Sequence, residues 1–445
     1  MLKAGVAKLD VTPPVGMRMA GFAGRVFPSL AVHDPLWARA VVFDDGKQRV
    51  GLVAMDLIGI WEPAVAQVRE GAAKSAGIAP EGLLLAGTHT HSGPTFWDDG
   101  TFTDQEKAYW AELPDRLTGL VNEAASNLVP AKVGAASGWC AVGINRREVV
   151  PGNLVVLGRN HFGIFDTELG LVRIDREDGT PLAGLMNYAC HAVCLMPDNY
   201  LTSADYPGYA VHHFEQRVPG AMGVFFQGAC GNINPREAAV NHGYVSGSSF
   251  GIAARAGQEV AREAARVWAK AEPTSSFDVR FANKTIALPT NRARALKSAE
   301  AALKDAERAA AEPRESKNPY MTWYTVPSPE RARKRVEEMK KQGDAPVECE
   351  IQAISLGPVT FVAWPGEIFC DFGMEVKQNS PFHPTYALGY ANGSIGYIPT
   401  PEAFKEGGYE ADTAAHLADN AGLVLVDETM KLLKELKERP VQTRE

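Results

Sequence analysis

The chain has 445 residues, of which 45% are hydrophobic and 22% are charged, and this composition is typical of a folded protein with one large or two smaller domains. The formal net charge of −8 disfavours a nucleic-acid partner, which would favour a basic surface. No stretch approaches the roughly 18 uninterrupted apolar residues that span a bilayer. The first residues lack an apolar segment with a cleavage site, so we expect a cytoplasmic protein unless the sequence is a trimmed, secreted form.

The first 130 residues predict strands that alternate with helices. Strand-like runs occupy residues 4–11, 38–43 and 50–60, and helical spacing occupies residues 63–76 and 103–127. The apolar run Leu83 to Ala86 predicts a further, buried strand that stops at Gly87. This alternation indicates a layered α/β fold.

Two histidines follow the strand at residues 83–86. The segment reads Thr88-His89-Thr90-His91-Ser92 and is closed by Gly93-Pro94. In an extended segment residues two apart share a face, so His89 and His91 could converge on one point. That arrangement suits a metal site or an acid–base pair, but the spacing alone also fits two hydrogen-bonded loop histidines.

The middle of the chain places further polar residues near strand ends. Expected strands cover residues 131–143, 169–175 and 182–190, and a strand beginning at residue 223 runs into the turn Gly231-Asn232-Ile233-Asn234-Pro235. Arg146, just past a strand end, could hold a carboxylate or an oxyanion, or be an ordinary surface arginine. His191 fits a ligand or a hydrogen-bonded core residue. Helices are expected at residues 209–216, capped by Asp205, and at residues 248–271.

The six cysteines follow no regular spacing and do not indicate a disulfide framework. Cys190 and Cys194 have a Cys-x3-Cys spacing without a second pair. We interpret them as small buried hydrophobic residues, with a redox or ligand role as the alternative.

The last third begins with a strand at residues 276–288 and a highly charged helical stretch at residues 291–341. Such stretches are typical of solvated helix faces, although the interruption near residues 313–329, with Tyr320, Trp323 and Tyr324, could be a lid or an oligomer contact. Strand-like residues 348–363 lead to Glu367, the strand at 386–391 precedes Tyr397, and a helix covers 421–437. Sites in α/β sheets form at strand ends, and two histidines with one carboxylate are a recurring catalytic zinc set.

These segments, in this order, resemble the neutral/alkaline ceramidases as far as about Glu410. The matching segments are Thr88-His89-Thr90-His91-Ser92-Gly93-Pro94, Asn145-Arg146, the strand ending in His191, Ser203-Ala204-Asp205 with Gly208-Tyr209-Ala210, Pro365-Gly366-Glu367, and Tyr397. The resemblance implies an α/β layered sandwich of mixed β-sheets flanked by helices. It also implies a zinc ion bound by His89, His191, Glu367 and Tyr397, with His91 and Arg146 beside the metal or in contact with substrate.

The sequence departs from that family in two places. Ceramidases carry Gly-Asp-Val-Ser-Pro at the turn whose serine acts on the amide, whereas Asn234 stands at that position here. A carboxamide can donate to an oxyanion but cannot be a nucleophile. We expect one catalytic domain over residues 1–445 with a charged helical insertion at about 290–345, without the family's C-terminal immunoglobulin-like domain.

We therefore predict a zinc-dependent hydrolase, an amidase that acts on a small-molecule or lipid-like, non-peptide amide by attack of zinc-bound water. His91 would take or relay the proton, and Arg146, Asn234 and Tyr397 would stabilise the oxyanion. Arg146, Asn232 and Asp205 are the expected substrate contacts. The alternatives are an ester or lactone hydrolase with the same zinc site and a non-catalytic metal-containing binding protein. Assembly into a homo-oligomer is a further alternative.

Overall fold

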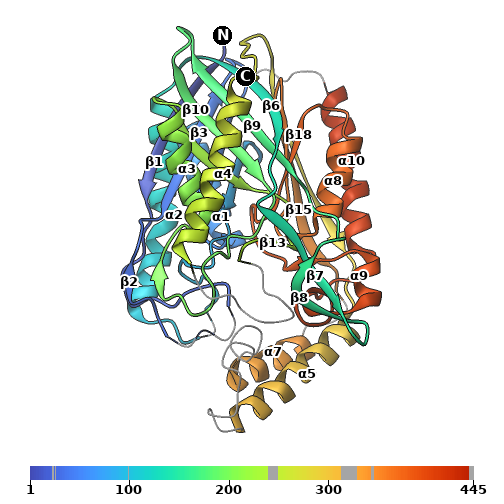
Figure 1. Cartoon of the computed structure of the whole chain (residues 1–445). Helices are drawn as coiled ribbons and strands as arrows, with labels where there is room; N and C mark the ends of the chain where they lie inside the picture. Colours follow the sequence, from blue (N-terminus) through green and yellow to red (C-terminus); the bar gives the residue numbers. More distant parts are fainter. Residues whose placement is uncertain are drawn as a thin grey trace.

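Two β-sheets packed face to face form the centre of the protein (Figure 1). The computed structural model describes residues 1–22, 25, 27–98, 100–238, 249–311, 328–341 and 345–439. The larger sheet has the order β12-β10-β9-β6-β1-β3-β4-β5, and the smaller sheet has the order β14-β15-β16-β18. Both sheets mix parallel and antiparallel neighbours, with parallel pairs at β4·β5, β10·β12 and β16·β18.

The strands of the larger sheet are β1 (Lys3–Asp10), β3 (Trp37–Asp44), β4 (Arg49–Met55), β5 (Leu83–Gly87), β6 (Val129–Trp139), β9 (Glu168–Arg176), β10 (Pro181–Tyr188) and β12 (Met222–Gln227). The smaller sheet contains β14 (Val279–Leu288), β15 (Val347–Leu356), β16 (Thr360–Ala363) and β18 (Thr385–Leu388). Short strands outside the two sheets are β2 (Ala31–Val32), β7 (Gly143–Val150), β8 (Leu154–Asn160), β11 (Leu201–Thr202), β13 (Ile233–Pro235), β17 (Glu367–Ile368) and β19 (Tyr397–Ile398).

The inner faces of the two sheets share one apolar core, which includes Phe43, Val172 and Phe226 from the larger sheet and Phe361 and Leu388 from the smaller. Strands that are covered on both faces, such as β4, β5 and β12, are almost continuously apolar instead of alternating. This packing explains the uninterrupted run at Leu83 to Ala86, which forms β5 and is wholly buried.

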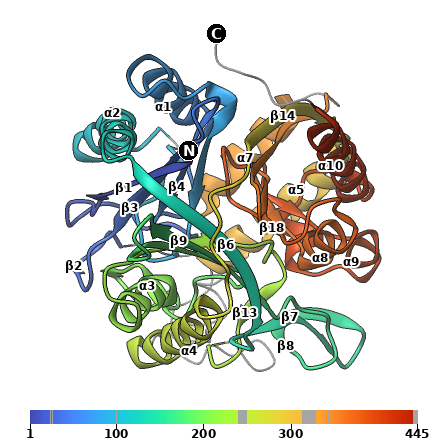
Figure 2. The ribbon, with the colours of Figure 1, turned by 90° about the horizontal axis from the view of Figure 1, so that it is seen from above.

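Helices cover the two outer faces (Figure 2). The larger sheet carries α1 (Glu62–Ser75), α2 (Asp104–Ser126), α3 (Asp205–Arg217) and α4 (Phe250–Trp268), and the smaller carries α8 (Cys370–Asn379) and α10 (Ala421–Glu438). Thr103 and Glu106 form a capping box at the start of α2, which explains why that helix begins where the sequence predicts. The predicted α/β layered sandwich of mixed sheets with flanking helices is confirmed.

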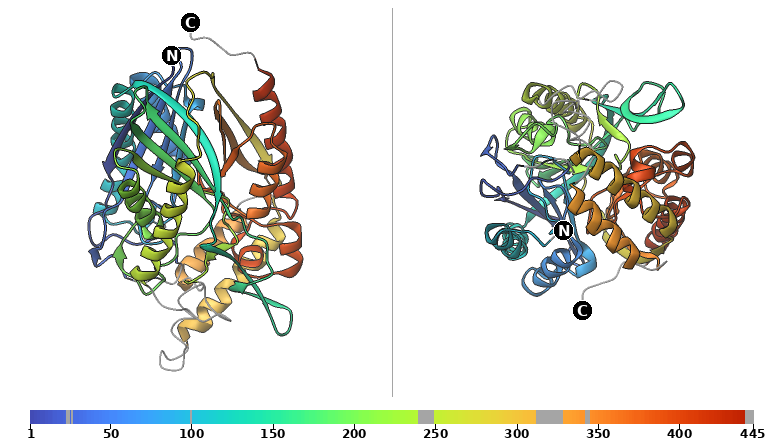
Figure 3. Two further views of the ribbon diagram at one scale, coloured as in Figure 1. Left: turned by 45° about the horizontal axis from the view of Figure 1, so that its top comes forward. Right: turned by 90° about the horizontal axis from the view of Figure 1, so that it is seen from below.

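In the part of the charged stretch that the structure describes, α5 (Arg292–Ala311) and α7 (Pro329–Lys341) pack on each other through Ala295, Ala299, Val336 and Met339. Figure 3 shows them lying across one end of the sandwich. The proposed lid residues Tyr320, Trp323 and Tyr324 lie outside the described residues. The helix α9 (Pro401–Glu406) and the short π-helix η3 (Tyr409–Ala414) lie near this end, and a 3-10 turn, η1 (Pro80–Gly82), precedes β5.

Three expected boundaries are wrong, each for a local reason. The strand expected over residues 50–60 ends at Met55, because the apolar residues that follow form a buried turn. The helix expected at 209–216 begins at Asp205, which is its first residue and not its cap. Arg146 lies inside β7 instead of beyond a strand end, because a new strand starts at Gly143. In the described ranges, no helix is both long and apolar enough to cross a membrane.

Candidate metal centre

The larger sheet and the separate two-stranded pair β17·β19 deliver the predicted site residues to one place. His89 follows β5 and His191 follows β10, while Glu367 and Tyr397 lie side by side in the parallel pair β17·β19. Main-chain contacts tie these segments together: Thr90 bridges Ala192, and the Gly87 N–H donates to the Tyr390 carbonyl at 3.1 Å. The carboxyl ends of neighbouring parallel strands are the usual location of sites in α/β sheets.

His89 reaches the site through an unusual backbone conformation. Its φ of 63° lies in the left-handed region, which is uncommon for residues other than glycine. Its Nδ1 lies 2.8 Å from the Ile58 carbonyl oxygen, so Nδ1 carries the proton and the Nε2 lone pair faces the cluster. The extended geometry expected for His89 and His91 is therefore wrong, although both rings do reach the same place, with centroids 4.8 Å apart.

His191 is fully buried and is oriented in the same way as His89. Its Nδ1 lies 2.8 Å from the Cys230 carbonyl oxygen and 3.1 Å from that of Ile233, which fixes the proton on Nδ1. Its Nε2 lies 3.1 Å from Oε2 of Glu367. Metal-binding histidines commonly donate their second ring N–H to a backbone carbonyl, and both histidines show that arrangement.

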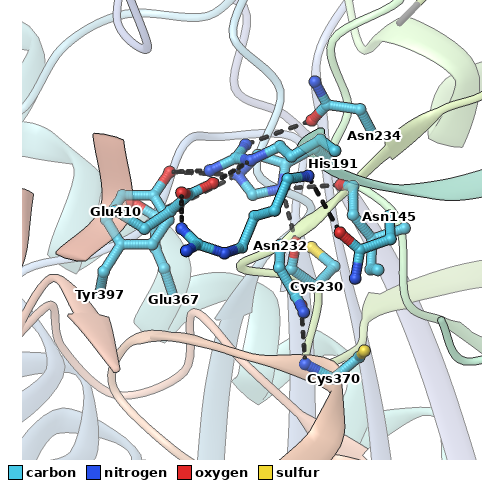
Figure 4. A network of polar contacts seen from close by, with 12 residues as sticks. Asn145, His191, Cys230, Asn232, Asn234, Glu367, Cys370, Tyr397 and Glu410 are labelled. Atoms are coloured by element: carbon cyan, nitrogen blue, oxygen red, sulfur yellow. Dashed lines mark hydrogen bonds and ion pairs between the residues drawn. The ribbon is translucent and has the colours of Figure 1, made fainter. Parts of the chain in front are cut away.

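The four implied zinc ligands converge at distances that suit a metal ion. Oε2 of Glu367 lies 3.4 Å from Nε2 of His89 and 3.1 Å from Nε2 of His191, and the Tyr397 hydroxyl lies 3.5 Å from Nε2 of His191. A tetrahedral zinc site with bonds of about 2.0–2.1 Å separates its ligand atoms by roughly 3.3 Å. The donor set of two imidazoles, a carboxylate and a phenol therefore fits zinc in both chemistry and spacing. Figure 4 shows His191, Glu367 and Tyr397 gathered at this point.

His91 is as close to the centre as the implied ligands are. Its Nε2 lies 3.2 Å from Nε2 of His89, and the ligand atoms of His89, His91 and His191 all lie within 4.8 Å of one another. This buried group of three histidines could hold a metal ion. The Nδ1 of His91 is buried without a hydrogen-bond partner, and the ring packs edge-on against Phe22.

Burial and mutual contact hold these side chains in the protonation states that bind a cation. Burial, aided by the Arg146 charge, lowers the pKa of His191 to about 4, so the imidazole is neutral near pH 7. Burial and the neighbouring histidines lower the pKa of His91 well below its ordinary value. Burial opposes ionisation of Glu367, but contacts with His89 and His191 outweigh it and hold the pKa of the carboxyl well below its usual range.

Arg146 lies against the metal ligands, and its charge is buried. Its Nη2 donates to the Tyr397 hydroxyl at 3.0 Å, and its Nη1 donates to Oδ1 of Asn234 at 3.2 Å. The same Nη1 lies 3.4 Å from Nε2 of His191. The structure therefore brings Arg146 and Asn234 to the cluster, where the guanidinium could bind a carbonyl oxygen or an oxyanion.

Asn232 and Asp205, which we expected to contact substrate, hold neighbouring backbone segments in place. Oδ1 of Asn232 accepts the Cys370 N–H at 2.9 Å, and its Nδ2 donates to Asp371 at 3.1 Å (Figure 4). The fully buried Asp205 carboxylate accepts backbone N–H groups, including that of Leu195 at 2.9 Å. It therefore secures the loop that follows His191, and we observe no polar contact from it to the described cluster.

Two residues beside the cluster were missed by sequence reasoning. Tyr390 stacks on the His89 ring with centroids 3.8 Å apart, and its hydroxyl lies 3.1 Å from the Cys230 sulfur. Glu410 accepts from Nε of Arg146 at 2.7 Å. Glu410 comes soon after Gly407-Gly408 and not after an expected strand. A search for polar residues at strand ends could therefore not select it.

Known proteins that are similar to this chain are ceramidases. The family model described as neutral/alkaline non-lysosomal ceramidase, N-terminal, matches residues 2–247. Neutral ceramidase of Pseudomonas aeruginosa is 26% identical over 247 residues, which are 52% of this chain and 36% of that protein. Neutral ceramidase of Mycobacterium tuberculosis is 27% identical over 240 residues, which are 50% of this chain and 37% of that protein. The chain thus matches little more than a third of the length of these relatives.

Solved ceramidase structures share the fold. A ceramidase complexed with C2 superposes with a TM-score of 0.74 at 18% identity, covering 100% of this chain and 76% of the other. The crystal structure of neutral ceramidase from Pseudomonas aeruginosa gives a TM-score of 0.70 at 18% identity, with the same coverage of both chains. The resemblance inferred from the motifs is confirmed. The chain belongs to the neutral/alkaline non-lysosomal ceramidase family.

Proposed function

We propose that the protein is a zinc-dependent hydrolase, an amidase, and that zinc is held by His89, His191, Glu367 and Tyr397. The observation that carries the proposal is the convergence of two Nε2 lone pairs, each fixed by an Nδ1 contact to a backbone carbonyl, on one Glu367 oxygen. Zinc bound there would polarise a substrate carbonyl and lower the pKa of a water molecule toward about 7.

The neighbouring side chains supply the remaining functions of an acyl hydrolase. Arg146 directs two Nη atoms toward the cluster, where they can bind the substrate carbonyl oxygen as negative charge develops on it. Nε2 of His91 faces the same space and, being neutral near pH 7, can accept the proton lost by an attacking water. The Tyr397 hydroxyl, already bonded to Arg146, lies beside this position.

Because the Asn234 carboxamide cannot act as a nucleophile, we favour direct attack by water over formation of an acyl-enzyme. Its Oδ1 accepts from Arg146, which leaves the NH₂ group as a donor for an oxyanion. The nearby Cys230 thiol is no substitute nucleophile, because burial raises its pKa well above its ordinary value and keeps it protonated. We propose that Asn234 stands where the family's serine acts and contributes an oxyanion contact instead.

The substrate that we propose is a small-molecule or lipid-like, non-peptide amide. The support is the family of the chain, whose similar relatives are named neutral ceramidases. We also propose that residues 1–445 form one catalytic domain, in which α5 and α7 are an insertion. The helix α5 contacts η3, Arg294 of α5 donates to the Leu417 carbonyl, and Arg335 of α7 donates to the Thr413 carbonyl. Contacts of this kind support an insertion at the rim of the sandwich.

The test is a hydrolysis screen with zinc-loaded protein over matched N-acyl amides and esters that share acyl chains, with ceramide included. We expect amide cleavage by the wild type, a loss of at least about a thousandfold in His89→Ala, and a loss of about ten- to a thousandfold in Asn234→Ala. His212→Ala, at an exposed position on α3, is the control and should retain activity.

Each other outcome of the screen contradicts part of the proposal. Cleavage of the esters alone would replace the amidase with an esterase. Bound metal without turnover of any acyl substrate would replace it with a metal-containing binding protein. Full activity in metal-free His89→Ala would contradict the metal-dependent mechanism itself.

A further inference from the structure

Glu410 is a buried carboxylate that joins two buried arginines behind the site. Its Oε1 accepts from Nε of Arg146 at 2.7 Å, and its Oε2 accepts from Nη1 of Arg147 at 2.8 Å. The side chains of all three residues are at most 6% exposed. A buried ion pair requires close geometry and several hydrogen bonds, and this arrangement provides both.

The local backbone explains how two consecutive arginines reach one carboxylate. Neighbouring residues of a regular strand point to opposite faces. The register of β7 against β8 shifts between Asn145 and Arg147, which marks a β-bulge or irregularity that can turn both side chains toward η3. Glu410 itself lies in η3, a π-helical turn closed by the Ala415 N–H to the Glu410 carbonyl at 2.9 Å, and such turns are frequent at functional sites.

The two arginines use their remaining donors in different directions. Arg147 donates to the carbonyl of Gly407 at 2.7 Å and to Glu406 at 3.2 Å, so it secures the chain between α9 and η3. Arg146 gives Nε to Glu410 and turns its Nη atoms to Asn234 and Tyr397 (Figure 4). Because the guanidinium is a rigid planar fork, fixing Nε fixes the direction of both Nη atoms.

We infer that Glu410 is a positioning residue, which holds Arg146 so that its Nη atoms face the position of the substrate's carbonyl or carboxylate oxygen. This inference rests on the proposed function, because it assigns Arg146 the task of binding that oxygen. It extends the site beyond its metal ligands to a residue on the far side of Arg146, and it names the atom, Nε, through which the residue acts.

The experiment measures carboxylate binding, so it needs no knowledge of the substrate. Hydrolysis of an amide or an ester releases a carboxylate, which Arg146 would hold, and octanoate is the probe. Calorimetric titration of the zinc-loaded wild type is compared with Arg146→Ala, Glu410→Gln and the double variant. Glu406→Gln is the matched control, because Glu406 contacts Arg147, is about half exposed and belongs to no part of the catalytic machinery.

We expect Arg146→Ala and Glu410→Gln each to weaken octanoate binding by about ten- to a hundredfold. The double variant should bind no more weakly than Arg146→Ala alone, because Glu410 acts only through Arg146. Glu406→Gln should bind as the wild type does. In the hydrolysis assay, Glu410→Gln should lower kcat with little change in KM when the rate is expressed per folded chain, because loss of folded protein alone would leave that normalised kcat unchanged.

Additive losses in the double variant, or wild-type octanoate affinity in Glu410→Gln, would overturn the inference. If Glu410→Gln does not fold, Glu410→Asp keeps the charge but shortens its reach, and it must show the same non-additivity. The proposed function fails separately: no turnover by any variant, with octanoate binding still dependent on Glu410, would remove the hydrolase and leave the positioning role in place.

Discussion

Backbone carbonyls, more than other side chains, orient the rings of the two histidines that we propose as metal ligands. The carbonyl of Ile58 holds Nδ1 of His89, and those of Cys230 and Ile233 hold Nδ1 of His191. A carbonyl oxygen can only accept, so each contact decides which nitrogen carries the proton. The ligand orientation therefore depends on the turns after β4 and β12, which the sequence pattern around the histidines does not reveal.

His191 should make the stability of the metal-free protein depend on pH. Its folded pKa of about 4 lies below the ordinary value of 6.5, so the folded state binds fewer protons in this interval. Stability from this residue is therefore fully present above pH 6.5 and is lost as the pH falls through about 4, by about 3 kcal/mol in total. Denaturant titrations from pH 7 to 4 should show a shallower loss in His191→Gln. Parallel curves for the two proteins would contradict the assignment.

Gly231 should tolerate no side chain. A Cβ at this position would meet the backbone carbonyl of Glu367, which cannot move without displacing a proposed ligand. We expect Gly231→Ala to lower the free energy of unfolding by about 1–3 kcal/mol and to weaken metal binding. The matched control is Gly119→Ala, because a Cβ on Gly119 meets nothing within 4 Å and alanine favours a helix by about 0.5–1 kcal/mol. Equal effects of the two substitutions would rule out the close approach.

At the residue level, the sequence identified side chains better than it identified their supports. His89, His91, His191, Glu367 and Tyr397 were all selected from motifs, and the structure brings them together. Asn232 and Asp205 belong to the same motifs but secure backbone, because a motif does not show which of its members face the site. Glu410 escaped notice because its partners, Arg146 and Arg147, lie 264 and 263 residues away in the chain.

Among the elements, η3 connects the helices α5 and α7 to the site. It carries Glu410 on one side and meets α5 and α7 on the other. Arg335 of α7 donates to the Thr413 carbonyl at 2.9 Å, and its Nη2 lies 3.3 Å from Nδ1 of His416. A π-helical turn has few hydrogen bonds of its own, so we infer that α7 stabilises its conformation.

Arg335→Met should loosen η3 without changing the sandwich. We expect hydrogen exchange of peptides that cover Tyr409–Ala414 to speed up by at least about tenfold, while peptides from β3 exchange as before. The control is Lys334→Met, at the exposed neighbouring position on α7. Unchanged exchange in η3 would show that α7 does not support this turn.

Element boundaries were predictable where local signals were strong. The capping box at Thr103 and Glu106 sets the start of α2, and the buried run at Leu83–Gly87 sets β5. The strand β7 was missed because it pairs with β8 and β13, outside the two large sheets, and its sequence has no regular alternation of apolar and polar residues. Arg146 is therefore expected just past a strand end, whereas it lies within β7 and reaches the cluster from there.

In the whole molecule, the two sheets pack against each other through a shared apolar core. Phe361 of β16 is 1% exposed and packs near Phe226 of β12 and Tyr386 of β18. The sequence predicted layers of sheets and helices, but it could not predict which strands face each other across this core, since that depends on contacts between distant segments. The family resemblance supplied that architecture.

Phe361→Ala should destabilise the protein by about 3–5 kcal/mol, because the cavity lies between two rigid sheets that cannot close over it. Val149→Ala removes an apolar side chain that is 59% exposed, so it should change stability by less than about 0.5 kcal/mol. Chemical denaturation of both variants measures the difference. A similar small effect of both substitutions would contradict a shared core between the sheets.

Metal content tests the central claim most directly. Protein saturated with zinc and then freed of excess metal should contain one zinc ion per chain by elemental analysis. His89→Ala, His191→Ala and Glu367→Gln should each retain well below that amount, while His212→Ala, at an exposed position on α3, should retain the wild-type amount. Wild-type zinc content in all three ligand variants, or no zinc in the wild type, would contradict a metal centre at this site.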